Sequence, residues 1–130
     1  MDYISHTAGG IALGAGCIYL CRKVNIEPNT IILIASSALG GLLPDIDHPK
    51  SYLGSKVFLI SDLLYSSVGH RTLTHSLLFA FIIGAAGLYF NPWIGLGIFV
   101  GIISHILLDL MTPTGVSFLY PFYKKRIKLN

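Results

Sequence analysis

The sequence predicts an all-α fold, an integral membrane bundle of about four transmembrane helices with one short interfacial helix. Of the 130 residues, 53% are hydrophobic and only 12% are charged, and the mean hydropathy is +0.69. Water-soluble domains contain about twice that share of charged residues. The apolar residues also gather into segments that contain almost no charge. We therefore expect residues 1–130 to form a single membrane-embedded domain.

Four apolar segments predict the spans: Ile4–Cys21, Thr30–Leu43, Leu73–Phe90 and Trp93–Met111. A helix rises about 1.5 Å per residue and the hydrocarbon core is about 30 Å thick, so the second segment is short and could be re-entrant. Glycines in the first and fourth segments allow close helix packing in lipid. The interfacial helix is expected over Lys56–Val68, where apolar residues recur at helical spacing beside polar ones.

The basic residues predict the orientation of the bundle. With four spans, seven basic residues lie on the side that holds both termini and the loop 44–72, whereas only Arg22 and Lys23 lie on the other side. Basic residues are in excess on the cytoplasmic side of membrane proteins. We therefore expect a multi-pass protein of the inner (cytoplasmic) membrane, with its termini and its long loop in the cytoplasm.

The same arrangement brings all five histidines and three of the six acidic residues to one membrane face. An ionised aspartate at the centre of a transmembrane helix costs about 2.5–3.5 kcal/mol, so Asp109 needs a partner or a cation. A divalent metal ion would supply that cation. The residues in this set are His6, Asp45, Asp47, His48, His70, His75, His105 and Asp109.

Three motifs carry these residues. His105 and Asp109 are four residues apart, hence on one helix face, where they offer a nitrogen and an oxygen ligand. Such a pair is also common as a purely structural hydrogen bond. Asp45 and Asp47 lie between two prolines, which predicts an extended loop with the two carboxylates on opposite sides. One would bind a metal and the other would orient a histidine, although both could be helix-cap or surface carboxylates.

The third motif is Gly69–Ser76, with the sequence GHRTLTHS. Two histidines five residues apart can face one site if His70 precedes a helix and His75 lies in its first turn. A threonine, at position 72 or 74, is expected to cap that helix. Arg71 could bind a phosphate beside the metal.

These motifs resemble the YdjM-like family of inner-membrane-associated, metal-dependent hydrolases, some of which are described as LexA-binding. The matching segments are Ser5-His6, G-x-L-L-P-D-I-D-H-P-x-S at 40–51, GHRTLTHS at 69–76 and H-I-L-L-D-L-M-T-P-x-G-V at 105–116. The family is distantly related to zinc-dependent phospholipase C and to single-strand nucleases, which are all-helical and hydrolyse phosphodiesters with clustered zinc ions.

The resemblance implies a site for a divalent metal, zinc above all. The chain has one H-x-x-x-D motif where those enzymes have two, so we expect one or two ions rather than three. The implied metal ligands are His6, Asp45, His70, His105 and Asp109. The implied catalytic residues are Asp47, His75 and Arg71. Asp47 and His75 could each bind the ion, support a ligand or act as general base, and Arg71 would balance charge on the substrate.

The implied reaction is hydrolysis of a phosphoester by a metal-activated water. A site at the lipid–water boundary favours a lipid-like or other amphiphilic substrate, and no direct nucleic-acid binding is predicted. Three alternatives remain: a metal-stabilised scaffold for a protein partner such as a LexA-type regulator, an ion carrier, and a structural hydrogen-bond network. Because the ionisable residues gather at one face only, an ion path is the least favoured of these.

Overall fold

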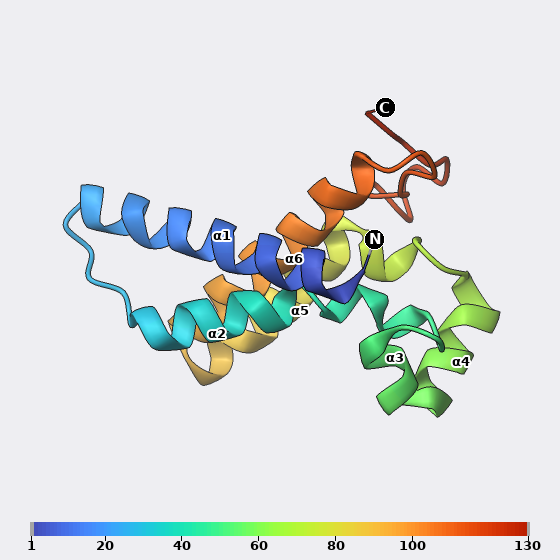
Figure 1. Cartoon of the computed structure of the whole chain (residues 1–130), viewed down its shortest axis with the longest axis horizontal. Coiled ribbons are helices and arrows are strands. Elements are labelled where there is room, and N and C mark those ends of the chain that lie inside the picture. Colours follow the sequence, from blue (N-terminus) through green and yellow to red (C-terminus); the bar gives the residue numbers. More distant parts are fainter. Residues whose placement is uncertain (1, 130) are drawn as a thin grey trace.

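Four apolar helices form the body of the molecule and pack along one another (Figure 1). The computed structural model describes residues 2–129. Helix α6 is central and packs against all three of the others. Their bounds are α1 (Tyr3–Lys23), α2 (Thr30–Gly40), α5 (Leu77–Phe90) and α6 (Pro92–Leu110). The predicted all-α fold is thus confirmed over the described residues, where the only β-type pairing is an isolated bridge between Val116 and Ile127.

Each of these helices begins where a side chain accepts a hydrogen bond from a free backbone N–H of the first turn. Ser76 caps α5, so the prediction of a threonine cap was wrong. Thr72 precedes the short 3₁₀ helix η2 (Leu73–His75), and Thr74 lies within it. The hydroxyl of Thr74 is engaged elsewhere, as described below. The four caps are Asp2, Asn29, Ser76 and Asn91.

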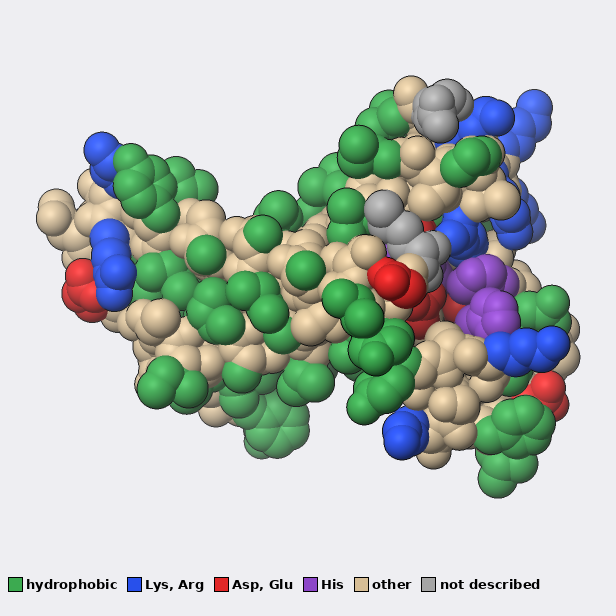
Figure 2. Space-filling view, viewed as in Figure 1, with side chains coloured by type: hydrophobic (Ala, Val, Ile, Leu, Met, Phe, Trp, Pro, Cys, Tyr) green, Lys and Arg blue, Asp and Glu red, His purple; other side chains and the backbone are tan. Residues whose placement is uncertain are grey.

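Within residues 2–129, three helical segments are long and apolar enough to cross a membrane: Tyr3–Lys23, Thr30–Asp47 and Pro92–Leu110. The second reaches this length because α2 is continued by the 3₁₀ helix η1 (Leu43–Asp47). Helix α5 has 14 residues and spans about 21 Å, less than a hydrocarbon core. Apolar side chains cover much of the outer surface of the bundle, as lipid contact requires (Figure 2).

Helix α2 lies in close contact with both α1 and α6. A Cβ atom at Gly10 of α1 would come within 2.3 Å of the Ser37 carbonyl oxygen, and one at Gly101 of α6 within 2.2 Å of the same atom. Glycine at these two positions therefore permits backbone-to-backbone packing, as in other membrane bundles. The consequence is that the site-bearing ends of α1, α2 and α6 meet.

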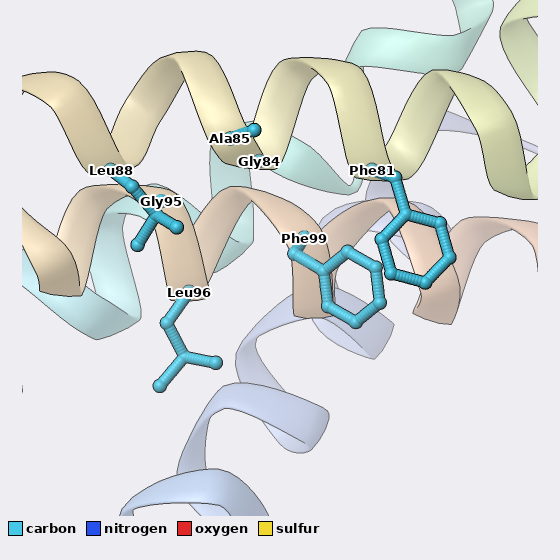
Figure 3. A pocket seen from close by; sticks show the side chains of 7 residues that line it. All are labelled: Phe81, Gly84, Ala85, Leu88, Gly95, Leu96 and Phe99. Carbon is cyan, nitrogen blue, oxygen red and sulfur yellow. The ribbon is translucent and has the colours of Figure 1, made fainter.

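Helix α5 packs on the other side of α6 and leaves an apolar groove beside the pair (Figure 3). The groove has a volume of about 260 Å³. Its walls are formed by Phe81, Gly84, Ala85, Leu88, Gly95, Leu96 and Phe99. None of these side chains can bind a metal or transfer a proton, so the groove is separate from the polar site.

The helix expected over Lys56–Val68 is α4 (Phe58–Val68), and a further short helix that was not predicted, α3 (Tyr52–Lys56), precedes it; the two diverge at Val57 beyond one end of the bundle (Figure 1). Ser51 caps α3 through its hydroxyl, which also donates to the Asp45 carbonyl oxygen at 2.6 Å. The segment after α6 folds back over the same end, where the Arg126 guanidinium donates to the His70 carbonyl oxygen. The segment with α3 and α4 and the segment after α6 thus cover the end of the bundle that carries the site.

Candidate metal centre

The ionisable residues converge at one end of the bundle, as the four-span arrangement predicts. Figure 2 shows histidine side chains at the surface there, next to basic side chains. Beneath them, five site residues are almost completely buried, each with 1% or less of its surface exposed; one is Asp47, and the other four belong to the ligand cluster described next. These four are His6, His75, His105 and Asp109. The burial of so many polar groups demands a partner for each of them.

His105 is oriented by the backbone of α2. Its Nδ1 atom lies 2.7 Å from the Gly41 carbonyl oxygen, which can only accept a hydrogen bond. Neutral His105 therefore carries its proton on Nδ1 and a lone pair on Nε2. This is the usual way in which a metal-binding histidine is held, with its second nitrogen fixed by a carbonyl group.

His75 is oriented in the same way by its neighbours in η2. The hydroxyl of Thr74 donates to Asp47 Oδ2, so its oxygen is free to accept from His75 Nδ1 at 3.1 Å. The neutral ring therefore also presents a lone pair on Nε2. The Nε2 atoms of His75 and His105 face each other at 3.0 Å, and two lone pairs at this distance need a cation between them.

Asp109 completes a triangle with these two nitrogens. Its Oδ2 atom lies 3.3 Å from His75 Nε2 and 3.4 Å from His105 Nε2. Bonds of about 2.0–2.1 Å in a tetrahedral zinc site place neighbouring ligand atoms about 3.3 Å apart. Asp45 Oδ1 lies slightly farther out, at 3.8 and 3.7 Å from the same nitrogens. The spacing of the donors thus fits a small ion with nitrogen and oxygen ligands.

His6 approaches from α1 and stacks on His105, with ring centroids 3.6 Å apart. Its Nε2 atom lies 3.6 Å from Asp109 Oδ1. Its Nδ1 atom is buried and has no hydrogen-bond partner within residues 2–129. A buried imidazole nitrogen without a partner is costly, so the protein groups around His6 do not satisfy this ring completely.

The potential ligands form two overlapping groups in which the donor atoms lie within 4.8 Å of one another. His105 belongs to both, with His6 and Asp109 in one group and Asp45 and His75 in the other. Imidazole and carboxylate donors together suit zinc, whereas calcium and magnesium prefer all-oxygen sites. The donor set therefore fits zinc, as it also fits manganese or iron, and the choice of one or two zinc ions remains an expectation from the family resemblance.

The carboxylates around His75 also favour a cation at this position. Burial alone would lower the pKa of this imidazole, but its hydrogen bonds to Asp109 and Asp47 outweigh burial and raise the pKa above its ordinary value. The surrounding carboxylates thus attract positive charge, which either a proton or a metal ion supplies.

The segment between the two prolines is the 3₁₀ helix η1, so the prediction of an extended loop was wrong. Pro44 lies in its first turn, where a missing backbone N–H costs nothing. The turn still sends the two carboxylates to different places. Asp45 faces the ligand cluster, whereas buried Asp47 lies 2.6 Å from His70 Nδ1 and accepts from the backbone N–H of Arg71 at 3.1 Å.

His70, which was predicted as a metal ligand, therefore lies outside both ligand groups. His75 belongs to one of these groups instead. The side chain of His70 is 24% exposed and lines the mouth of the site. His48 does so too, with its Nδ1 atom accepting from the Lys50 backbone N–H at 3.1 Å. The structure thus brings together four of the five predicted ligands and adds His75.

Arg71 is held in place by several contacts. Its backbone has a φ of +62°, a left-handed conformation that is strained for arginine. The guanidinium donates to Asp109 Oδ1 at 3.3 Å, to the Thr112 hydroxyl at 3.0 Å and to the Thr114 hydroxyl. Sequence analysis missed both threonines, although their position directly after the helix of Asp109 was a usable signal.

A polar cavity of about 280 Å³, the mouth pocket, opens over this cluster. Every lining residue is polar or charged: His6, Asp45, His48, Lys50, Ser51, His70 and Arg71. The pocket therefore connects the candidate ligands with the surface through a basic, hydrogen-bonding wall.

Comparison with known proteins finds a matching family model and several relatives. The model of the family described as YdjM inner membrane protein matches residues 1–130. The chain is 37% identical to the uncharacterized protein YvsG of Bacillus subtilis over 90% of its length and 71% of that protein. It is 44% identical to the inner membrane protein YdjM of Escherichia coli, over 87% of the chain and 64% of that protein. It is also 31% identical to the inner membrane protein YbcI of Escherichia coli, over 95% of the chain and 69% of that protein.

The chain thus spans about two thirds of the length of these relatives. No solved structure matches it.

Proposed function

Because the chain belongs to the YdjM inner membrane protein family, we propose that it is a metal-dependent hydrolase that cleaves a phosphoester of an amphiphilic substrate at the cytoplasmic face of the membrane. One observation carries the proposal. The Nε2 atoms of His75 and His105 face each other at 3.0 Å beside the Asp109 carboxylate, with both Nδ1 atoms engaged by other partners. Donors arranged in this way suit a cation.

The residues that would hold the metal are His75, His105 and Asp109, with Asp45 and His6 beside them. Two overlapping groups allow one or two ions, and zinc suits the donor set best. A bound zinc ion would supply Lewis acidity, which makes water a nucleophile near neutral pH.

Proton transfer falls to His70. Asp47 is fully buried and holds His70 Nδ1 at 2.6 Å, so the proton on Nδ1 is fixed and Nε2 is left to exchange a proton in the mouth pocket. This is the arrangement by which a buried carboxylate orients a histidine base. The role of Asp47 is therefore to orient His70.

Arg71 provides the positive charge toward the substrate. Its guanidinium lines the mouth pocket and is held by Asp109 and Thr112, so little reorganisation is needed when negative charge develops there. The strained backbone of Arg71 supports such a role, since strain is retained where it positions a functional group.

The position of the site suggests the kind of substrate. His6 lies in the first turn of α1, and Asp109 lies next to the last residue of α6, so the site is at the end of the apolar helices. A substrate with an apolar tail in the bilayer would present its polar group at this level.

The test is zinc-dependent turnover by the purified protein in detergent, on p-nitrophenyl phosphate and on short-chain phospholipids. We expect turnover that chelation abolishes and that zinc restores. His105→Gln should abolish it while the helical circular dichroism spectrum is unchanged, and Asp62→Asn, an exposed site on α4, should retain it. Bound zinc without turnover on any substrate would contradict the proposal and favour a metal-stabilised scaffold.

A further inference from the structure

We propose that the mouth pocket binds the terminal phosphate of a phosphomonoester, with Lys50 and Arg71 as its cationic contacts. This inference rests on the proposed function, because it names the group that the hydrolase would present to the ligand cluster. It assigns a role to Lys50, which the mechanism above does not use.

Lys50 lines the pocket as a free cation. Its side chain is exposed, and no carboxylate lies within 4.0 Å of it among residues 2–129. Its backbone is nevertheless fixed, because its N–H donates to His48 Nδ1 and the hydroxyl of Ser51 is tied to the Asp45 carbonyl oxygen. The backbone of Lys50 is thus held in place, and its ammonium group is available to bind an anion.

Arg71 lines the same pocket from the other motif. Asp109 and two threonine hydroxyls hold its NH1 and NH2 groups. A guanidinium has five N–H donors, so donors remain for an anion after these contacts are made. A lysine and a pre-oriented arginine in one cavity form a typical phosphate-binding pair.

Size and charge limit the ligand further. The cavity of about 280 Å³ is slightly smaller than the pockets of about 300–1,000 Å³ that take drug-sized molecules. One tetrahedral phosphate with a small substituent fits, whereas a large second substituent does not. With a divalent ion in place, that ion together with Lys50 and Arg71 outweighs the carboxylates of Asp45, Asp47 and Asp109, so the pocket attracts an anion, and a doubly charged one more strongly than a singly charged one. A phosphomonoester is a dianion near neutral pH, whereas a phosphodiester has one charge and a second ester arm.

The experiment is a calorimetric titration of inorganic phosphate into the zinc-loaded protein in detergent. Lys50→Met should weaken phosphate binding about tenfold, because it removes a charge-assisted hydrogen bond, and should leave the zinc content unchanged. Lys23→Met is the matched control, since it makes the same charge change at the far end of α1 and should bind phosphate as the wild type does. Equal affinity of wild type and Lys50→Met would overturn the inference.

Competition with esters tests the ligand class. Glycerol 3-phosphate in solution and phosphatidic acid in nanodiscs are both monoesters, and displacement of inorganic phosphate by either one supports the inference and identifies the source. Displacement by neither, or equally strong displacement by the diester glycerophosphocholine, would refute it. The zinc content separates the two claims: a protein that binds no zinc contradicts the proposed function, whereas a zinc-loaded protein whose phosphate affinity does not depend on Lys50 contradicts this inference alone.

Discussion

Replacing Asp109 with asparagine should greatly weaken metal binding without creating a cavity, since the two side chains are nearly isosteric. The carboxylate is 1% exposed, and its oxygens lie 3.3–3.6 Å from the Nε2 atoms of three histidines. The same carboxylate accepts from Arg71 at 3.3 Å. Asp109 is thus the anionic ligand with the most contacts in the cluster, and its charge is the main electrostatic attraction for a cation.

The size of the effect follows from the number of ligands. A structural zinc site contributes about 10–16 kcal/mol in total, hence about 2.5–4 kcal/mol per ligand in a four-ligand site. The loss of one ligand should therefore weaken zinc binding by at least about 100-fold. Zinc at 100 times the wild-type Kd stabilises the wild type by about 2.7 kcal/mol, and at the same concentration it should stabilise Asp109→Asn by only about 0.4 kcal/mol.

The assay is elemental analysis of the purified protein, followed by unfolding with and without zinc. Asp62→Asn on α4 is the control, because it makes the same charge change at an exposed position. We expect zinc to stabilise the wild type and the control equally and Asp109→Asn hardly at all.

A different outcome would show that the reasoning is wrong. If the cluster were only a buried ion-pair network, removal of one partner would cost about 3–5 kcal/mol whether or not zinc was present. Zinc would then leave the unfolding of the wild type unchanged, and elemental analysis would find no metal.

Three further predictions follow from the packing and the topology. Asp47→Asn should weaken zinc binding about 10–100-fold in a chelator competition, because Asp47 also holds Thr74 and the Nδ1 side of the ligand His75; unchanged affinity would contradict this. Gly101→Ala should lower the free energy of unfolding in a detergent-denaturation titration, because a Cβ atom at this position would collide with the α2 backbone. Gly16→Ala is the control: its Cβ atom would meet nothing within 4 Å, so the substitution should be neutral or stabilising. In a cysteine-free background, a membrane-impermeant maleimide should label Glu27→Cys from outside the cell and Lys56→Cys only after the membrane is opened. Labelling of both from one side would refute the topology.

Much of the fold could be predicted from the sequence. Long runs of apolar residues must be helical in lipid, because no water is present to satisfy the backbone, so the four apolar helices could be placed to within a few residues. The predicted span Leu73–Phe90 is nevertheless the shorter helix α5, which leaves three segments of membrane-spanning length within residues 2–129. The number of spans then decided which loops share a face. That count alone placed His6, Asp45, His105 and Asp109 at one end of the bundle, where the structure brings them together.

The short turns could not be predicted in the same way. The apolar run that begins at Leu73 looks continuous, yet α5 starts only at Leu77, because Ser76 caps it by accepting from the Phe79 backbone N–H, while the hydroxyl of Thr74 donates to Asp47. Likewise, two prolines suggested an extended segment, but Pro44 is tolerated in the first turn of η1. Local hydrogen bonds of single side chains decided both cases, and such bonds depend on which partners the fold brings near.

The sequence by itself therefore determined the class of the protein, an all-helical membrane bundle, and the set of residues from which a metal site can be built. Only the tertiary structure decided which of these residues face the ligand cluster and which face other partners. His75 faces His105 because Thr74 and Asp47 hold its other nitrogen, and His70 turns away toward Asp47. These roles depend on the distances between side chains on separate elements, and helix packing sets such distances, whereas spacing along the chain does not.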